Sequence, residues 1–219
     1  MNDAIRENGY VVLRPRISDN QVRLWKRLAL KERNTLPHMA HSTTMWEIRT
    51  HPEIRRIFET IWNTKDLIVS YDGMSLRTRI DQPFELGFHV DQDDTESIDQ
   101  GAIQGVFALS YSNEKTGGTL IVPRSHKRHD LITHNLCTVK TENHWQFVPI
   151  KESSEIFKHA DPPSQPSLVP GDMLLFDSRT VHAVLPPTDA DSERMVAYIC
   201  MGPRAFASQS ILRKRRLAY

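Results

Sequence analysis

The sequence contains few of the features that define several common protein classes. Its 219 residues include only two cysteines, Cys137 and Cys200, which excludes a disulfide scaffold and favours a reducing compartment. No apolar run approaches membrane-spanning length, and the first residues contain no hydrophobic stretch of the kind that a secretory signal requires. We therefore expect an intracellular, cytoplasmic protein without membrane contact.

An excess of charge of either sign is also missing. The 28 Lys and Arg residues against 27 Asp and Glu leave a formal net charge of +1, so the composition gives no reason to expect binding to nucleic acid. Hydrophobic residues make up 39% of the chain, which is enough for a folded core, and the length fits one domain. Ten histidines are many for this length, and we look for function among them.

The hydrophobic pattern predicts a helical leader, about residues 1–66, followed by a β-rich core. A strand is expected at 9–13, a helix from Ser18 to about 32, and a second helix from Pro52 to about 61. From residue 67 the period changes to two, which predicts strands at 67–71, 74–79, 87–91, 104–111, 119–122, 145–148, 173–176, 181–185 and 194–201. Many short strands after a helical leader indicate a sandwich or barrel with helices packed outside.

The segment from about 126 to 166 differs from the strands around it. It is polar, contains five histidines and ends in the proline-rich sequence DPPSQP. Long irregular segments between core strands often cover active sites, so we expect a lid-like insertion within a single domain of residues 1–219. The basic cluster RKRR at 213–216 is expected to be a solvated end of the chain.

Three His-x-acid triplets could each supply two ligands to a metal ion. Mononuclear iron oxygenases bind Fe(II) through two histidines and one carboxylate, and a strand presents residues i and i+2 on the same side. The triplet at His51 lies at a predicted helix start, and the triplet at His159 lies in the polar insertion. Only His89-Val-Asp91 alternates with apolar neighbours as a metal-bearing strand requires.

His182 is the best candidate for the third ligand, because it lies in the short apolar strand VHAVL at 181–185. Arg194 opens the next apolar strand, and a hairpin brings it back beside His182. Period two then places Arg194 on one face with Val196 and Tyr198. An arginine on the inward face of an apolar strand is costly unless it meets an anion.

In this order, the motifs resemble those of the phytanoyl-CoA dioxygenase family of Fe(II)/2-oxoglutarate oxygenases, over nearly the whole chain. ENGYVVL at 7–13 is similar to the family's opening strand, FHVDQ at 88–92 to its metal strand, TGGTLIVPRSHK at 116–127 to its glycine-turn segment, and PGDMLLFD at 170–177 to its second metal element. The resemblance implies a mainly β fold with flanking helices, built on a double-stranded β-helix (jelly-roll, cupin-like) core.

The resemblance also implies cofactors and the residues that bind them. Two histidines and one aspartate would hold Fe(II) and support catalysis: His89, Asp91 and His182. Arg194 would bind the distal carboxylate of 2-oxoglutarate, with Thr119 and Phe107 as further contacts to this co-substrate. Such an enzyme uses O2 to hydroxylate or otherwise oxidise a small-molecule substrate and releases succinate. The sequence leaves the oligomeric state open.

Several positions depart from the family's usual pattern. Arg124 stands where the family usually has glycine, Val184 stands where many members have a serine that contacts 2-oxoglutarate, and a common aromatic position falls on Val106 or Phe107. An alternative is therefore a mononuclear non-haem iron oxygenase on the same fold that does not use 2-oxoglutarate, with Arg194 binding a substrate carboxylate. A non-catalytic β-helix domain is disfavoured because all three metal ligands are present.

The sequence does not name the substrate. Polar and aromatic candidates for substrate contacts lie in the leader, the insertion and the early strands: Trp46, Arg49, Arg77, Arg79, His126 and Trp145.

Overall fold

A computed structural model describes the chain except for residues 34–37, 79–80, 82–84, 92–101, 132–147, 151–156, 158–159, 190 and 218–219. The helices are α1 (Asn2–Asn8), α2 (Asp19–Arg33), α3 (Thr43–Thr50), α4 (Pro52–Trp62) and α7 (Gln209–Leu217), with short 3-10 turns at Met39–His41, Ser125–Arg128 and Arg204–Phe206. The strands are β1 (Tyr10–Leu13), β2 (Leu67–Val69), β3 (Met74–Arg77), β4 (Leu86–Val90), β5 (Ile103–Ala108), β6 (Gly118–Ile121), β7 (Val148–Pro149), β8 (Met173–Asp177), β9 (His182–Leu185) and β10 (Arg194–Pro203).

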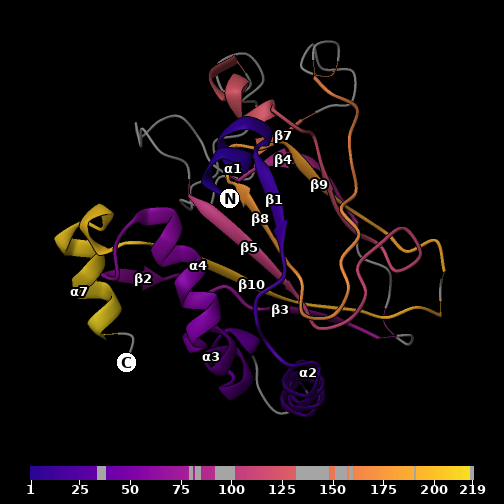
Figure 1. The fold of residues 1–219 in the computed structure, drawn as a ribbon, viewed down its shortest axis with the longest axis horizontal. Coiled ribbons are helices and arrows are strands. Elements are labelled where there is room, and N and C mark those ends of the chain that lie inside the picture. Colours follow the sequence, from indigo (N-terminus) through magenta and orange to yellow (C-terminus); the bar gives the residue numbers. More distant parts are fainter. Residues whose placement is uncertain are drawn as a thin grey trace.

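Two antiparallel sheets form the core of the molecule (Figure 1). The larger sheet has the order β1-β8-β5-β10-β2, and β3 also pairs with β10. The long strand β10 therefore bonds to β5 along one edge and to β3 and then β2 along the other. The smaller sheet has the order β6-β9-β4-β7. This arrangement confirms the predicted mainly β fold with a jelly-roll core and flanking helices.

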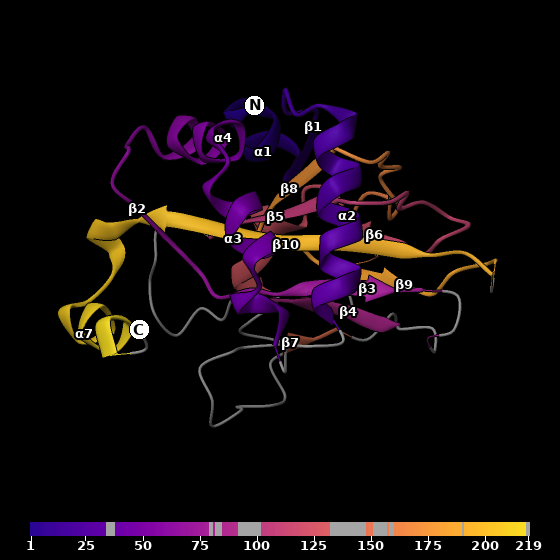
Figure 2. The same cartoon turned by 90° about the horizontal axis from the view of Figure 1, so that it is seen from below.

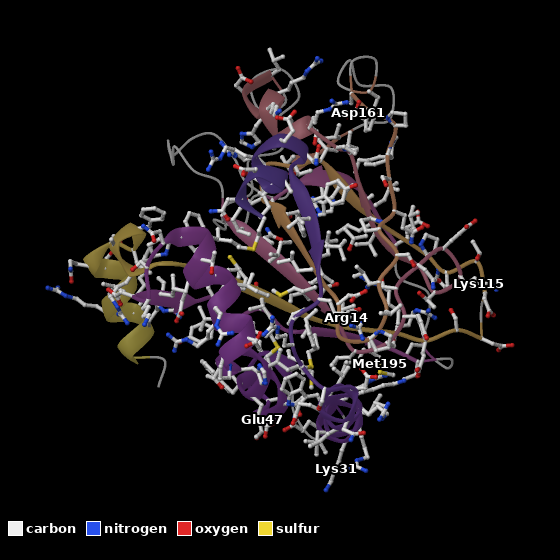
Figure 3. All side chains as sticks on the ribbon, in the orientation of Figure 1. Arg14, Lys31, Glu47, Lys115, Asp161 and Met195 are labelled. Carbon is white, nitrogen blue, oxygen red and sulfur yellow. The ribbon has the colours of Figure 1, made fainter. Side chains whose placement is uncertain are left out.

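The helices α2, α3 and α4 cover the outer face of the larger sheet, and the smaller sheet lies on its other side (Figure 2). A large apolar cluster fills the layer between these helices and the sheet, and it includes Trp25, Phe58 and Phe107. Met195 on β10, labelled in Figure 3, belongs to this cluster and is fully buried. Burying these large side chains supplies most of the driving force for this layer.

A second cluster lies between the two sheets. It joins Val106 and Ala108 of β5, Val196 of β10 and Leu174 of β8 to Ile121 of the smaller sheet. These residues alternate along their strands with the residues that face the helices, as period two requires. The space between the sheets is therefore lined mainly by apolar side chains, and any polar group on this lining stands out.

The predicted helix starts are confirmed by their caps. The Ser18 hydroxyl accepts a hydrogen bond from the Gln21 amide at 3.2 Å, next to the start of α2. At the start of α4, the His51 ring accepts from the Glu53 amide at 3.3 Å, and Pro52 occupies the first turn. The first of the three His-x-acid triplets is thus a helix cap.

Three further helices were not predicted individually: α1 and α3, which lie within the predicted helical leader, and α7, which lies outside it. The basic cluster at 213–216, expected to be a solvated end of the chain, lies within α7. Helix α1 ends at Gly9, whose φ of 84° is favourable for glycine and strained for other residues. None of the helices in the described ranges combines the length and apolar composition that crossing a lipid bilayer requires.

Most of the predicted lid at about 126–166 lies outside the described residues, so the lid stays a prediction. The strand expected at 145–148 is described only from Val148, where β7 begins and pairs with β4. Residues 160–166 are also described, and Ser164 pairs with Ile121 at the edge of the smaller sheet.

Candidate metal centre

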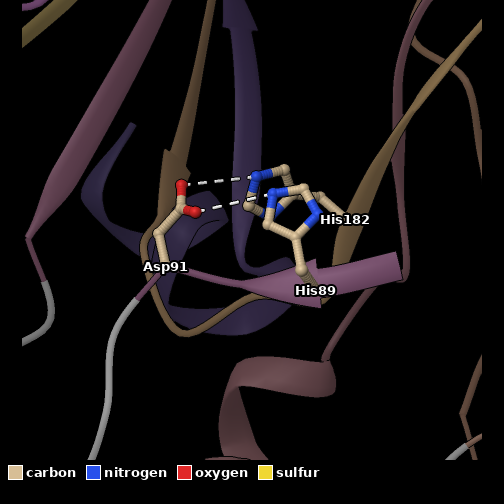
Figure 4. A group of neighbouring side chains, drawn as sticks. All are labelled: His89, Asp91 and His182. Carbon is tan, nitrogen blue, oxygen red and sulfur yellow. Dashed lines mark ion pairs between the residues drawn. The ribbon is translucent and has the colours of Figure 1, made fainter. Parts of the chain in front are cut away.

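Two neighbouring strands of the smaller sheet bring His89, Asp91 and His182 together (Figure 4). His89 lies near the end of β4, Asp91 directly follows that strand, and His182 opens β9. In the antiparallel pairing of β4 with β9, His89 and His182 are direct partners. The structure therefore places all three predicted metal residues in one group, with their ligand atoms within 4.8 Å of one another.

Both imidazole rings are oriented for metal binding by backbone contacts. The Nδ1 atom of His89 lies 2.8 Å from the Gly87 carbonyl oxygen, and Nδ1 of His182 lies 3.0 Å from the Thr180 carbonyl oxygen. Because a carbonyl oxygen only accepts, each Nδ1 carries the proton and donates it. Each Nε2 is thereby the unprotonated nitrogen, whose lone pair can bind a metal, which is the arrangement usual for histidine ligands.

The carboxylate completes the triangle. Oδ1 of Asp91 lies 3.5 Å from His89 Nε2, and Oδ2 lies 3.4 Å from His182 Nε2. From the larger sheet, the Gln104 side chain donates to Asp91 Oδ2 at 2.9 Å. The Asp91 side chain is 30% exposed, whereas those of His89 and His182 are 3% and 6% exposed. The carboxylate thus marks the more open side of the centre.

The electrostatics keep the two kinds of ligand in their metal-binding forms at neutral pH. Burial, with a contribution from the charge of His182, lowers the pKa of His89 to about 4. Burial alone would raise the pKa of Asp91, but the adjoining His182 and His89 rings and the hydrogen bond from Gln104 outweigh burial, so the pKa falls. His89 is therefore neutral and Asp91 ionised, as metal ligands must be.

This donor set fits a divalent transition metal. Two imidazole nitrogens and one carboxylate on one side of an ion leave further positions open, which is the geometry of non-haem Fe(II) oxygenases. The protein residues that would hold the ion are His89, Asp91 and His182. Within the described ranges, no other group of histidine, cysteine and acidic residues brings three ligand atoms within 4.8 Å of one another.

The third triplet ends at Asp161, whose carboxylate forms an ion pair with Arg124 (Asp161 is labelled in Figure 3). His159 lies outside the described residues. Arg124 itself has a φ of 62°, the left-handed conformation that favours glycine. The turn therefore keeps the backbone expected of the family's glycine, while its arginine engages the carboxylate of the competing triplet.

Arg194 lies on the inner face of β10, as predicted, with Val196 and Tyr198. It is 4% exposed, and its Nε donates to the Ser112 hydroxyl at 3.1 Å. Its Nη2 is buried and has no hydrogen-bond partner among the described residues. A buried guanidinium nitrogen without a partner is costly, so this atom is suited to receive an anionic ligand.

The two other residues predicted to contact the co-substrate have different positions. Thr119 is buried on β6, directly opposite Val184 of β9. Phe107 faces the helices, where its ring packs edge-on against Trp25 with centroids 5.9 Å apart. Of the two residues considered for the aromatic position, Val106 lines the space between the sheets and Phe107 does not. The structure therefore does not bring Phe107 together with the metal centre.

The residues predicted to contact the substrate lie in different parts of the fold. Arg49 is buried in α3 beside Trp46 and donates to backbone carbonyls, and one of these belongs to Asp72. His126 packs against the end of α1, where its Nε2 lies 3.1 Å from the Arg6 carbonyl oxygen. Arg77 is the cross-strand partner of Arg194. Arg79 and Trp145 lie outside the described residues.

Three polar residues near the site were missed from the sequence. Gln104 could have been found, since it occupies an inward position of an apolar strand. Ser112 gives no local signal, because it contacts an arginine 82 residues away. Asp72, whose pKa is raised mainly by burial, lies near Cys200 on the inner face of β10, and burial followed by the charge of Asp72 raises the pKa of that thiol to about 12.

Fold and site together define a jelly-roll protein with a two-histidine, one-carboxylate metal centre between its sheets. The model of the family described as Phytanoyl-CoA dioxygenase (PhyH) matches residues 3–191. The chain belongs to this family.

Individual relatives are more distant. "Ava biosynthesis cluster protein O" from Aspergillus versicolor is 28% identical over 193 residues, and the chain spans 61% of the length of that protein while 83% of the chain is covered. The crystal structure of the epimerase SnoN in complex with Fe3+, alpha ketoglutarate and nogalamycin RO is similar with a TM-score of 0.72 and 18% identity, covering 92% of this chain and 82% of that one. The crystal structure of EctD from S. alaskensis is similar with a TM-score of 0.70 and 15% identity, and the match covers 96% of this chain and 78% of that one. These structures support the fold.

Proposed function

We propose that the chain is an Fe(II)- and 2-oxoglutarate-dependent dioxygenase that hydroxylates or otherwise oxidises a small molecule. The observation that carries the proposal is that a group of residues able to hold a metal occurs together with a buried arginine on the lining between the sheets. His89, Asp91 and His182 would hold the ion. The buried Nη2 of Arg194, which has no partner among the described residues, would bind the 2-oxoglutarate carboxylate that lies farthest from the metal ion. Membership of the family and the alpha ketoglutarate complex of SnoN support this reading.

In this proposal, each residue of the candidate site has a separate role. Bound Fe(II), with O2 and 2-oxoglutarate, would supply the oxidising chemistry. Gln104 fixes the orientation of the Asp91 carboxylate, and the Gly87 and Thr180 carbonyls fix the two rings. Arg194 would bind and orient the co-substrate through a charge-assisted contact.

The apolar lining has its own role. Val106, Ala108, Leu174 and Val196 form a buried apolar cluster on the strand faces that look into the space between the sheets. Electrostatic contacts between a guanidinium and a carboxylate are stronger in such a lining than in water. Thr119 places a hydroxyl opposite Val184, so this strand pair still offers one at the position where the family's serine is absent.

A competing function is an iron oxygenase that does not use 2-oxoglutarate, with Arg194 binding a carboxylate of the substrate itself. Val184 is the observation that favours it. The deciding experiment supplies the Fe(II)-loaded protein with O2 and 2-oxoglutarate and measures succinate by mass spectrometry, alone and with pools of small molecules. Succinate that depends on 2-oxoglutarate and is lost in Asp91→Ala is the expected result. Oxidation of a substrate at full rate without any keto acid would instead establish the competing function.

A further inference from the structure

A second arginine lies beside Arg194 on the neighbouring strand, with its side chain on the same face of the sheet. In the pairing of β3 with β10, Arg77 is the direct partner of Arg194. The next residues, Leu76 and Met195, are also partners and lie in the helix-facing cluster. Because side chains alternate, Arg77 and Arg194 both point to the inner face, where they are 8% and 4% exposed. Two buried arginine side chains therefore lie next to each other on the lining between the sheets.

The two guanidinium groups differ in their hydrogen bonds. Arg77 is satisfied by neutral acceptors: it donates to the Ser192 carbonyl and the Thr116 carbonyl, both at 2.9 Å, and to the Ser192 hydroxyl at 3.1 Å. Arg194 is held by Ser112 at its Nε, and its Nη2 has no partner among the residues that the structure describes. Arg77 thus connects two loops at this end of the sheet, whereas Arg194 has a donor to spare.

Those loops also support the partner of Arg194. The Ser112 hydroxyl lies 3.4 Å from the carbonyl oxygen of Gly117, the residue that follows the Thr116 carbonyl held by Arg77. Gly117 has a φ of 75°, which few other residues adopt. The bonds of Arg77 therefore help to fix the turn against which Ser112 and Arg194 are placed.

Within the described part of the chain, no carboxylate compensates this pair of charges by direct contact. Among the residues that the structure describes, neither Arg77 nor Arg194 forms an ion pair with Asp or Glu. Burial and then the charge of Arg194 lower the pKa of Arg77, while the charges of Asp81 and Asp189 act in the opposite direction. Like charges directly opposite each other destabilise a sheet, and a bound anion removes that cost.

We propose that Arg77 is a positioning and specificity-determining residue, which together with Arg194 makes this end of the lining selective for a dicarboxylate over a monocarboxylate. The inference rests on the proposed function in its choice of 2-oxoglutarate as the natural ligand. Arg194 makes the direct contact to the distal carboxylate. Arg77 adds a second positive charge close behind it and holds the turn at 116–117 in place.

The test compares 2-oxoglutarate with pyruvate, a 2-oxo acid that lacks the distal carboxylate. Dissociation constants are measured anaerobically by calorimetry on the Fe(II)-loaded wild type, Arg77→Gln and Arg77→Lys. A second unit charge several ångströms away changes binding of a carboxylate by roughly ten- to thirtyfold. We expect Arg77→Gln to lose that much affinity for 2-oxoglutarate, with pyruvate and Fe(II) affinities unchanged. Arg77→Lys should restore part of the selectivity, since it keeps the charge without the forked hydrogen bonds.

Arg204→Gln is the matched control. Arg204 follows the other end of β10, is exposed and pairs with Asp66, so its loss removes the same charge without touching the lining. An unchanged ratio of the two dissociation constants in folded Arg77→Gln and Arg77→Lys, verified by their melting curves, would overturn the inference. Equal losses of affinity for both ligands leave this ratio unchanged and would indicate a general structural defect, which does not discriminate between the ligands.

Metal-free protein separates this inference from the proposed function. Succinate has two carboxylates and needs no metal, so its binding reports on the arginine pair alone. Succinate binding that is lost in Arg77→Gln, in a protein that never consumes 2-oxoglutarate, would retain the inference and reject the dioxygenase. Absence of any binding of succinate or 2-oxoglutarate to the wild type would reject the inference.

Discussion

His89 and His182 are direct cross-strand partners, with ring centroids 4.0 Å apart, so the register of β4 against β9 creates the metal centre. A slip of one residue in either strand would turn one ring to the opposite face. On that opposite face, Val90 and Val181 are buried in a separate apolar cluster. The burial of these residues therefore holds the ligands in place.

Removal of any one ligand should abolish metal binding. We expect His89→Ala, Asp91→Ala and His182→Ala each to weaken Fe(II) binding by more than about a hundredfold, because two remaining ligands cannot hold the ion. Anaerobic titration with Fe(II) measures this. His51→Ala and Asp161→Ala are the controls from the competing triplets, and a loss of iron binding in either would show that the wrong triplet has been identified.

Gln104→Leu tests the support of the carboxylate. Loss of its hydrogen bond to Asp91 should weaken Fe(II) binding by roughly 10- to 100-fold, as is usual for groups that orient metal ligands. Gln209→Leu, at the exposed start of α7, should leave Fe(II) binding unchanged. Equal iron affinity in Gln104→Leu and wild type would mean that this hydrogen bond does not help to orient the Asp91 carboxylate.

Arg194 separates metal binding from co-substrate binding. Arg194→Ala should leave Fe(II) affinity nearly unchanged and weaken 2-oxoglutarate by about 2–5 kcal/mol, or roughly 30- to several-thousand-fold. Arg194→Lys should recover only part of the loss. Ser112→Ala removes the bond to Nε and should cost less, about 1 kcal/mol. Calorimetry with 2-oxoglutarate gives all three values, and an unaffected affinity in Arg194→Ala would reject this role.

The pKa of His89 predicts how the metal-free protein responds to acid. The pKa is about 4 in the folded chain against 6.5 for a free histidine, so the unfolded chain binds the extra proton between these values. Stability should therefore fall as pH drops from about 6.5 towards 4, by up to about 3 kcal/mol. Urea unfolding at several pH values measures the slope, which should be smaller in His89→Ala. The same slope in that variant would assign the effect to other groups.

Gly9→Ala tests the junction between α1 and β1. A Cβ atom at this position would lie 2.7 Å from Nδ1 of His126, and the φ of 84° is unfavourable for alanine. We expect a loss of about 2–3 kcal/mol in the free energy of unfolding. Gly202→Ala is the control, because nothing lies within 4 Å of its Cβ position. Similar stability of the two variants would contradict the close packing around His126.

The sequence predicted most strands of the described core, and it singled out three residues that the structure brings together, because strand residues follow a period of two. It could not decide between Val106 and Phe107, since a shift of one residue along a strand exchanges its faces. The structure resolves this by placing Phe107 against Trp25. The short helices α1 and α3 were missed, because helices of one or two turns are stabilised by packing more than by propensity.

The contacts that complete the site were harder to predict for a different reason. The bond from Arg194 to Ser112 joins residues far apart in the chain, and no local pattern marks Ser112. The pairing of Arg77 with Arg194 depends on how β3 is aligned with β10. Sequence periodicity fixes the face on which a side chain lies, but alignment between strands decides which side chain it meets.

Strand β10 is held along one face by packing, which keeps the distances between residues on its other face constant. Arg194 stands at one end of its inner face, and Cys200, paired with Gln104, stands roughly 20 Å along it. Met195 and Ala197 anchor the reverse side in the helix-facing cluster. The distance along the strand between these two ends of its inner face is thereby constant, because packing against the helices prevents the strand from bending or shifting.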